Sequence, residues 1–108
     1  MERSEYVRLV LDAYRSTPGV AGVVRRADRL LAAQLHERGV AFETVANAFV
    51  LAVSRRLARP EGAAPLGTIR SLAYFSPIID EVLASNVSSQ YFDYLRHRLK
   101  RASRSSRG

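Results

Sequence analysis

The longest apolar segment of the chain lies between Gly39 and Pro60 and constrains the fold more than any other feature. Hydrophobic residues recur there at helical spacing, at Phe42, Val45, Ala46, Phe49, Val50, Val53 and Leu57. Ala48, Leu51 and Ala52 extend this stripe almost all round the helix, which is typical of a helix that several neighbours contact. Gly39 is a natural terminator of the preceding helix, and Pro60 prevents continuation of this one. We therefore predict a central helix over about 42–58.

Two helices are predicted before this segment. The first begins at Ser4 as N-cap and stops at Pro18-Gly19. Its inward face holds Tyr6, Leu9, Val10, Ala13 and Tyr14. The second runs from about Arg25 or Ala27 to Arg38, with Leu30, Leu31, Gln34 and Leu35 around its inner face. Residues 20–24, VAGVV, are compatible with an extended segment, but no partner strand is evident in the sequence, so we interpret them as a packed linker.

The segment that follows the central helix contains a proline within a helical pattern. After the loop 59–67, Thr68 is the predicted cap of the next helix. Pro77 either kinks one continuous helix or begins a new helix capped by Ser76; the break is favoured. Ile78, Ile79 and Val82 are then predicted core, as is Phe75.

A last helix is predicted from the cap Ser88 to about residue 101, with Tyr91, Leu95 and Leu99 as its seam and Phe92 beside it. These segments together predict an all-α fold: a single compact bundle of five to six helices over residues 1–101, followed by a basic disordered tail over 102–108. The 108 residues suffice for one such core. No apolar run reaches the roughly 18 residues that span a bilayer, and no signal peptide is evident, so a cytoplasmic protein without membrane contact is expected.

The sequence contains no catalytic signature. The two histidines, His36 and His97, lie among residues typical of exposed surfaces, and neither has an evident orienting partner. Asp80 and Glu81 are adjacent, so their side chains do not face each other on a helix. The chain has no cysteine and no glycine-rich phosphate loop. We predict a protein that is not an enzyme and has no cofactor, catalytic residues or metal site.

The positive charge is concentrated at the C-terminus. The net charge is +7, and residues 89–108 contribute +5 of it through six basic residues against Asp93. Arginine number alone is weak support for polyanion binding, because 16 of the 17 basic residues are arginine, as a GC-rich genome would produce. Placement is more informative: the basic residues of the last helix follow the aromatic residues Tyr91, Phe92 and Tyr94, and the predicted phosphate contacts are Arg96, Arg98, Lys100, Arg101 and Arg104. The alternative interpretation is a solubilising tail.

A second basic group opens the helix that precedes Gly39. Arg25, Arg26 and Arg29 lie where the helix dipole favours acidic residues, and only Asp28 offsets them. They are candidate anion contacts, although arginines on a solvated face are the favoured interpretation.

Residues 28–83 resemble the C-terminal helical domain of DnaD-like replication proteins. The resemblance rests on Leu31 and Leu35, the turn Gly39-Val40, the positions Val45, Ala48 and Ala52, and the motif YFSPIIDEV over 74–82. Val82 occupies the position of the family's tryptophan, Pro77 and the long loop 59–67 depart from the pattern, and the family's N-terminal winged-helix domain has no counterpart before the match. The resemblance implies DNA binding through Tyr74 and the basic helix 89–101, in a replication or mobile-element context.

Together these features predict a non-enzymatic nucleic-acid-binding protein with DNA as the expected partner; composition does not distinguish DNA from RNA. The alternative is a helical protein–protein adaptor, or a small subunit of a nucleoprotein or ATPase assembly. In that case the apolar surplus of helix 42–58 would form a homodimer seam or contact a protein partner. Tyr74 is either core or a contact residue, and a buried structural tyrosine is the favoured interpretation.

Overall fold

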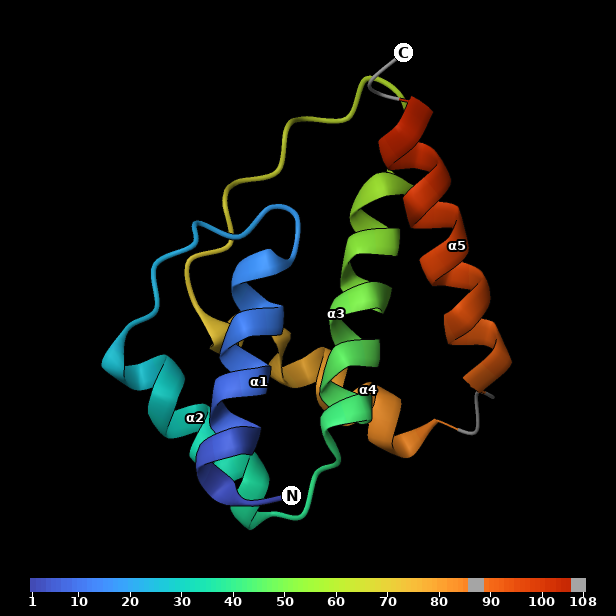
Figure 1. The fold of residues 1–108 in the computed structure, drawn as a ribbon. Coiled ribbons are helices and arrows are strands. Elements are labelled where there is room, and N and C mark those ends of the chain that lie inside the picture. The colour runs from blue at the N-terminus through green and yellow to red at the C-terminus, as the bar shows by residue number, and fades with distance from the viewer. Residues whose placement is uncertain (86–88, 106–108) are drawn as a thin grey trace.

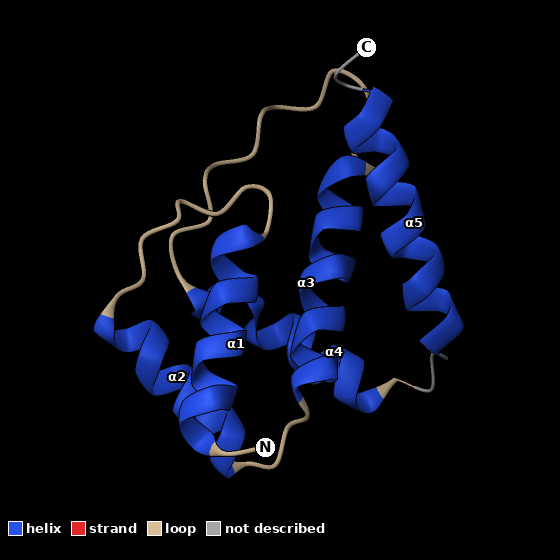
Figure 2. Cartoon of the chain, viewed as in Figure 1, coloured by secondary structure: helices blue, strands red, loops and turns tan. Residues whose placement is uncertain are grey.

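A computed structural model describes residues 1–85 and 89–105, with side chains described for 1–85 and 90–101. Its described part contains five α-helices, one 3₁₀ helix and no strand (Figures 1 and 2). The elements are α1 (Arg3–Ser16), α2 (Arg26–Glu37), α3 (Phe42–Leu57), η1 (Leu72–Phe75), α4 (Ser76–Ala84) and α5 (Ser89–Ser105). The predicted all-α bundle is confirmed. None of the helices in the described ranges is long and apolar enough to cross a membrane.

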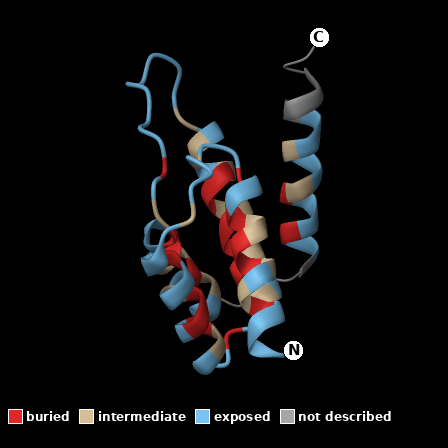
Figure 3. Cartoon of the chain, turned by 60° about the vertical axis from the view of Figure 1, so that its left-hand side comes forward, coloured by how far each residue is buried: buried red, intermediate tan, exposed pale blue. Residues whose placement is uncertain are grey.

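Helix α3 is the centre of the bundle, as its apolar stripe predicted. It contacts α1, α4, α5 and η1, and Figure 3 shows its buried residues facing the interior. Val45, Ala48, Phe49 and Ala52 are all buried. The core beside it is aromatic: the Phe49 and Phe75 rings lie 4.7 Å apart, and the Tyr14 ring meets Phe75 edge-on at 6.1 Å.

The proline segment is divided at the predicted place. The 3₁₀ helix η1 ends at Phe75 and α4 begins at Ser76, so Pro77 lies in the first turn of α4. Its missing N–H is harmless there because the first N–H groups of a helix have no intrahelical acceptor. The predicted cap at Ser76 is one residue off, because the N-cap is Phe75. Phe75 and Ile79 are fully buried, which confirms their assignment to the core.

The end of α2 agrees with the sequence, but its buried face does not. Gly39 has φ +75°, and the Val40 N–H donates to the Leu35 carbonyl, which is the glycine-terminated helix end predicted there. Leu30, however, is 52% exposed and Gln34 is exposed as well. Leu35 is buried and Leu31 is half-buried against the core, as predicted, but the rest of the buried face is formed by Asp28, Ala32 and Ala33.

Asp28 explains this rotation of α2. Its carboxylate is 2% exposed and accepts two backbone N–H groups, from Arg25 at 2.8 Å and from Leu72 at 2.9 Å. Arg25 is the N-cap of α2 and Leu72 is the first residue of η1, so one carboxylate caps the starts of two helices. Burying Asp28 between α2 and η1 turns Leu30 outward.

Two loop segments pair across the bundle where a linker and a helix cap were predicted. Val20 and Ile69 form an isolated parallel β-bridge, in which the Ala21 N–H donates to the Ile69 carbonyl at 2.9 Å and the Ile69 N–H to the Gly19 carbonyl at 2.7 Å. The start of the predicted linker 20–24 therefore pairs with the segment before η1. The prediction of Thr68 as a helix cap is wrong, since the next helix begins only at Leu72.

Both ends of the helical region differ slightly from the predicted boundaries. Helix α1 starts at Arg3 with Glu2 as N-cap, so Ser4 is not the cap. Helix α5 continues to Ser105, past the predicted domain end at residue 101. The predicted cap Ser88 and residues 106–108 of the predicted tail lie outside the described residues.

Candidate nucleic-acid interface

Helix α5 is attached to the bundle by one face, which packs mainly against α3 (Figure 1). Phe92 and Leu95 are buried there, and Leu99 is half-buried. Tyr91, predicted to belong to this seam, is instead 43% exposed. The remaining surface of the helix faces solvent, which leaves the basic and tyrosine side chains free to meet a ligand.

Arg96, a predicted phosphate contact, is half-buried at the edge of the packed face. Its guanidinium donates a hydrogen bond to the Asn47 side-chain oxygen on α3 and lies 3.2 Å from the Asp93 carboxylate. Asn47 is itself buried, so this bond satisfies a polar group inside the α3–α5 contact. Arg96 therefore positions α5.

Three of the predicted basic contacts remain on the exposed side of α5. Arg98, Lys100 and Arg101 are exposed, and none of them has a carboxylate within 4.0 Å among the described residues. Tyr94 is 57% exposed, and the Arg98 guanidinium carbon lies 6.0 Å from its ring centroid. Tyr94, Arg98 and Arg101 share one side of the helix because they are spaced at i, i+4 and i+7. Arg104 lies on the same helix, but its side chain is outside the described part.

Outside α5, five of the eleven arginines in the described residues are paired with carboxylates. In the described residues six arginines form ion pairs, at Arg3–Glu37, Arg8–Asp12, Arg15–Asp12, Arg38–Asp80, Arg55–Glu81 and Arg96–Asp93. The Arg55–Glu81 pair is bidentate and joins α3 to α4. Its hydrogen bonds lower the pKa of Glu81 and raise that of Arg55. Five of these six arginines lie outside α5.

The basic start of α2 does not extend the α5 surface. Arg25, Arg26 and Arg29 are exposed, but α2 and α5 lie on opposite sides of the bundle, with α1 and α3 between them (Figure 1). The Asp28 carboxylate already accepts the Arg25 N–H at this helix start. The two predicted basic groups are therefore separate surfaces.

Tyr74 is exposed, in contrast to the buried tyrosine that the sequence favoured. It is 43% exposed, and its hydroxyl lies 3.4 Å from an Arg56 guanidinium nitrogen. Arg56 also donates to the Gly67 carbonyl at 2.9 Å, so Tyr74 is held against the loop that follows α3. It does not lie on α5, and the structure does not join it to Tyr91 and Tyr94 in one contact.

The hollow between α3 and α5 was not predicted from the sequence. Its lining residues are Ser54, Leu57, Ala58, Leu95, Arg98 and Leu99. Leu57 is 61% exposed although it was assigned to the core stripe. The position of Leu57 as the last residue of α3 could have indicated its exposure, because the end of a helix has fewer neighbouring elements to cover it.

No group of three or more His, Cys, Asp or Glu side chains that could hold a metal ion occurs within residues 1–85 and 89–105. Comparisons with protein-family models, with curated proteins and with solved structures find no match to this chain.

Proposed function

We propose that this chain is a non-enzymatic nucleic-acid-binding protein, that its ligand is DNA, and that it binds through the exposed side of α5. The observation that carries the proposal is the group Arg98, Lys100 and Arg101, which is exposed and free of carboxylate partners within the described residues. Unpaired cations on the exposed surface of a helix release counterions when phosphates approach, which is the main source of affinity in sequence-independent binding. A paired arginine contributes less because its carboxylate must first be displaced.

The tyrosines of α5 add a second contribution. Tyr91 and Tyr94 are 43% and 57% exposed, and Tyr94 lies beside Arg98. An exposed ring next to a cation suits a base that stacks while its phosphate is neutralised. This arrangement favours single strands or duplex ends, whose bases are accessible, over the interior of a duplex.

The resemblance to DnaD-like replication domains adds a context, namely DNA replication or a mobile element. It also points to Tyr74, whose exposure leaves the ring accessible. We place Tyr74 outside the main contact surface because it lies on η1 and is held by Arg56.

The salt dependence of binding tests the proposal quantitatively. Each neutralised phosphate contributes about −0.9 to the slope of log K against log salt on duplex DNA, so three contacts give a slope of about −2.7. Affinity should then fall roughly 40-fold between about 50 and 200 mM salt. The measurement is fluorescence anisotropy with labelled single-stranded DNA, duplex DNA and RNA of equal length. For single strands, about −0.7 per contact gives a slope of about −2.

Three matched triple variants locate the surface, and each removes three positive charges. The first changes Arg98, Lys100 and Arg101 to glutamine, and most of the slope should disappear. The second changes the ion-paired α1 residues Arg3, Arg8 and Arg15, and the slope should remain. The third changes Arg25, Arg26 and Arg29 and asks whether the start of α2 contributes. Equal losses in all three variants, or an affinity independent of salt, would refute α5 as the contact surface; tighter binding of RNA than of either DNA would refute DNA as the ligand.

A further inference from the structure

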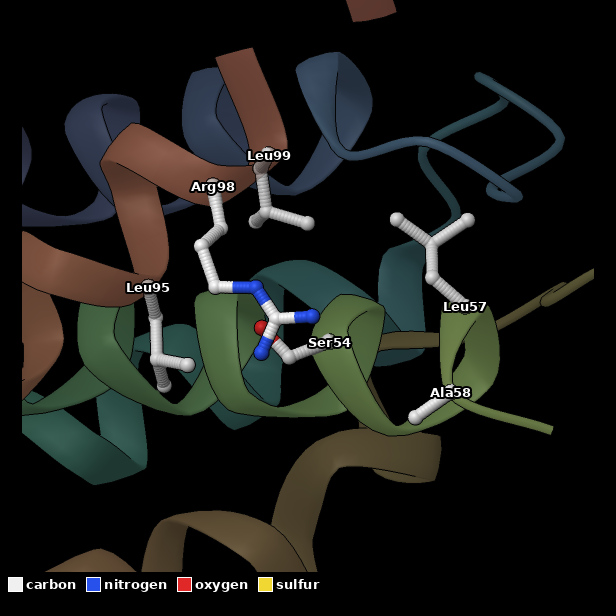
Figure 4. Close-up of a pocket in the computed structure, with 6 residues that line it drawn as sticks. All are labelled: Ser54, Leu57, Ala58, Leu95, Arg98 and Leu99. Carbon is white, nitrogen blue, oxygen red and sulfur yellow. The ribbon is translucent and has the colours of Figure 1, made fainter. Parts of the chain in front are cut away.

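An apolar hollow with a basic edge lies where the C-terminal end of α3 meets α5. Its volume is about 210 Å³. Leu57 at the end of α3 and its C-cap Ala58 line the hollow together with Leu95 and Leu99 of α5, and the Arg98 side chain reaches across toward Ser54 (Figure 4).

The two polar side chains of this hollow have no acidic partner in the described part of the chain. The Ser54 hydroxyl oxygen is buried and has no hydrogen-bond partner there. Arg98 has no carboxylate partner among the described residues, and no acidic residue lines the hollow. A hydroxyl and a guanidinium both donate hydrogen bonds, so the groups at the edge suit a carboxylate.

A second hollow lies on the other side of Leu57. It is formed by Pro18, Gly19, Val53, Arg56, Leu57, Arg59 and Leu66, and its volume is about 320 Å³. Leu57 and Leu66 are 61% and 45% exposed, and Arg59 adds a further cation without a carboxylate partner in the described residues. Leu57 is thus an exposed apolar ridge between two hollows, with a cation near each.

We propose that this surface binds an acidic segment of another protein. One leucine-like side chain of that segment lies in the hollow between α3 and α5, and its carboxylates contact Arg98 and Arg59. The hollow beside α5 is smaller than the roughly 300–1,000 Å³ of ordinary small-molecule sites, so it fits a side chain better than a cofactor. The net charge of +7 disfavours a second copy of this chain, whose like charges would repel. Nucleic acid is a poorer occupant because phosphate gains nothing from the exposed leucines.

Short peptides test this proposal directly and independently of nucleic-acid binding. The probe is an acetylated, amidated heptapeptide with a central leucine flanked by three glutamates on each side. Its matched control carries alanine at the centre, and a second control carries lysines in place of the glutamates. Binding is followed by backbone amide NMR shifts at physiological salt. The leucine peptide should shift the amides around Ser54, Leu57 and Leu99 and bind about tenfold tighter than the alanine peptide, with no saturable binding of the lysine peptide.

Two variants of the protein then separate the apolar and charged contributions. Leu57→Asp should weaken the leucine peptide about tenfold or more, and Arg98→Ala should weaken it several-fold. The control is Leu83→Asp on α4, which changes a side chain that is 47% exposed and lines neither hollow. The proposal is overturned by equal binding of the leucine and alanine peptides, by equal effects of Leu57→Asp and Leu83→Asp, or by shifts that map to the start of α2. It is also overturned if the leucine peptide shows no saturable binding at about 1 mM.

Discussion

Replacing Asp28 by alanine should destabilise the protein far more than replacing any surface carboxylate. The Asp28 side chain accepts the Arg25 and Leu72 N–H groups while only 2% exposed. In the variant the Leu72 N–H, on a residue with 0% exposure, loses its acceptor and gains no access to water. A buried unsatisfied donor costs about 1–3 kcal/mol, and the bond from Arg25 to a charged acceptor adds a similar amount, reduced because Arg25 is exposed. The expected loss of unfolding free energy is about 2–4 kcal/mol.

Urea unfolding followed by far-ultraviolet circular dichroism measures this loss. With a denaturant dependence of about 2 kcal/mol/M, the midpoint should fall by roughly 1–2 M. Asp12→Ala is the matched control, because that carboxylate makes only surface ion pairs with Arg8 and Arg15; it should change stability by less than about 1 kcal/mol. Asp28→Asn keeps one acceptor oxygen and should fall between the two. If Asp28→Ala and Asp12→Ala shift the midpoint equally, the shared cap does not hold α2 to η1.

Three further substitutions test other parts of the structure. Tyr14→Phe should leave stability unchanged or raise it by up to about 1 kcal/mol in urea unfolding, because the Tyr14 hydroxyl is buried without a hydrogen-bond partner in the described residues. Burial and then the Asp28 charge raise the pKa of Tyr14, so the wild type should lose stability as pH rises through that raised pKa, and the variant should lose less. Glu81→Gln should be less stable than wild type at pH 7, because Arg55 lowers the pKa of Glu81 in the folded protein. This stabilisation is lost as the pH falls below the ordinary pKa of 4.5, so the difference should shrink in acid. An equal difference at pH 7 and in acid would contradict this. Gly39→Ala should cost about 1 kcal/mol in the same assay because φ is +75°, whereas Gly67→Ala, which meets nothing within 4 Å and has no positive φ, should be neutral.

Local patterns predicted the features that depend on neighbouring residues. The span of α3, the helix end at Gly39 and the division at Pro77 all follow from side-chain period or backbone restriction within a few residues. The face of α2 could not be predicted this way. Counting hydrophobic residues placed Leu30 inward, whereas the buried position belongs to Asp28, whose second N–H donor is 44 residues away at Leu72.

The same reason explains the errors in the loops and in α5. The bridge between Val20 and Ile69 joins segments that lie far apart in the chain, and neither segment alone indicates a partner. Arg96 was predicted as a phosphate contact because it lies in a basic run, and that prediction could not show its hydrogen bond to the buried Asn47 on α3. A polar group's partner is set by the tertiary structure, so a charge pattern predicts which helix is basic but not which of its cations are free.

Ion pairing, more than arginine number, therefore decides where this protein can attract an anion. Six arginines in the described residues have carboxylate partners: three on α1, one on α3, one on α5, and Arg38 just after α2, so the surface of α1 is largely neutral locally. Arg25, Arg26 and Arg29 at the start of α2 have no such partner among the described residues, and neither do Arg59, Arg98, Lys100 and Arg101. The latter four lie toward the C-terminal ends of α3 and α5, which Figure 1 shows at one end of the bundle. Arg98 belongs both to the exposed side of α5 and to the hollow beside Leu57. If both proposals hold, nucleic acid and an acidic protein segment compete for this one side chain, and the leucine peptide should displace DNA from the wild type but not from Leu57→Asp.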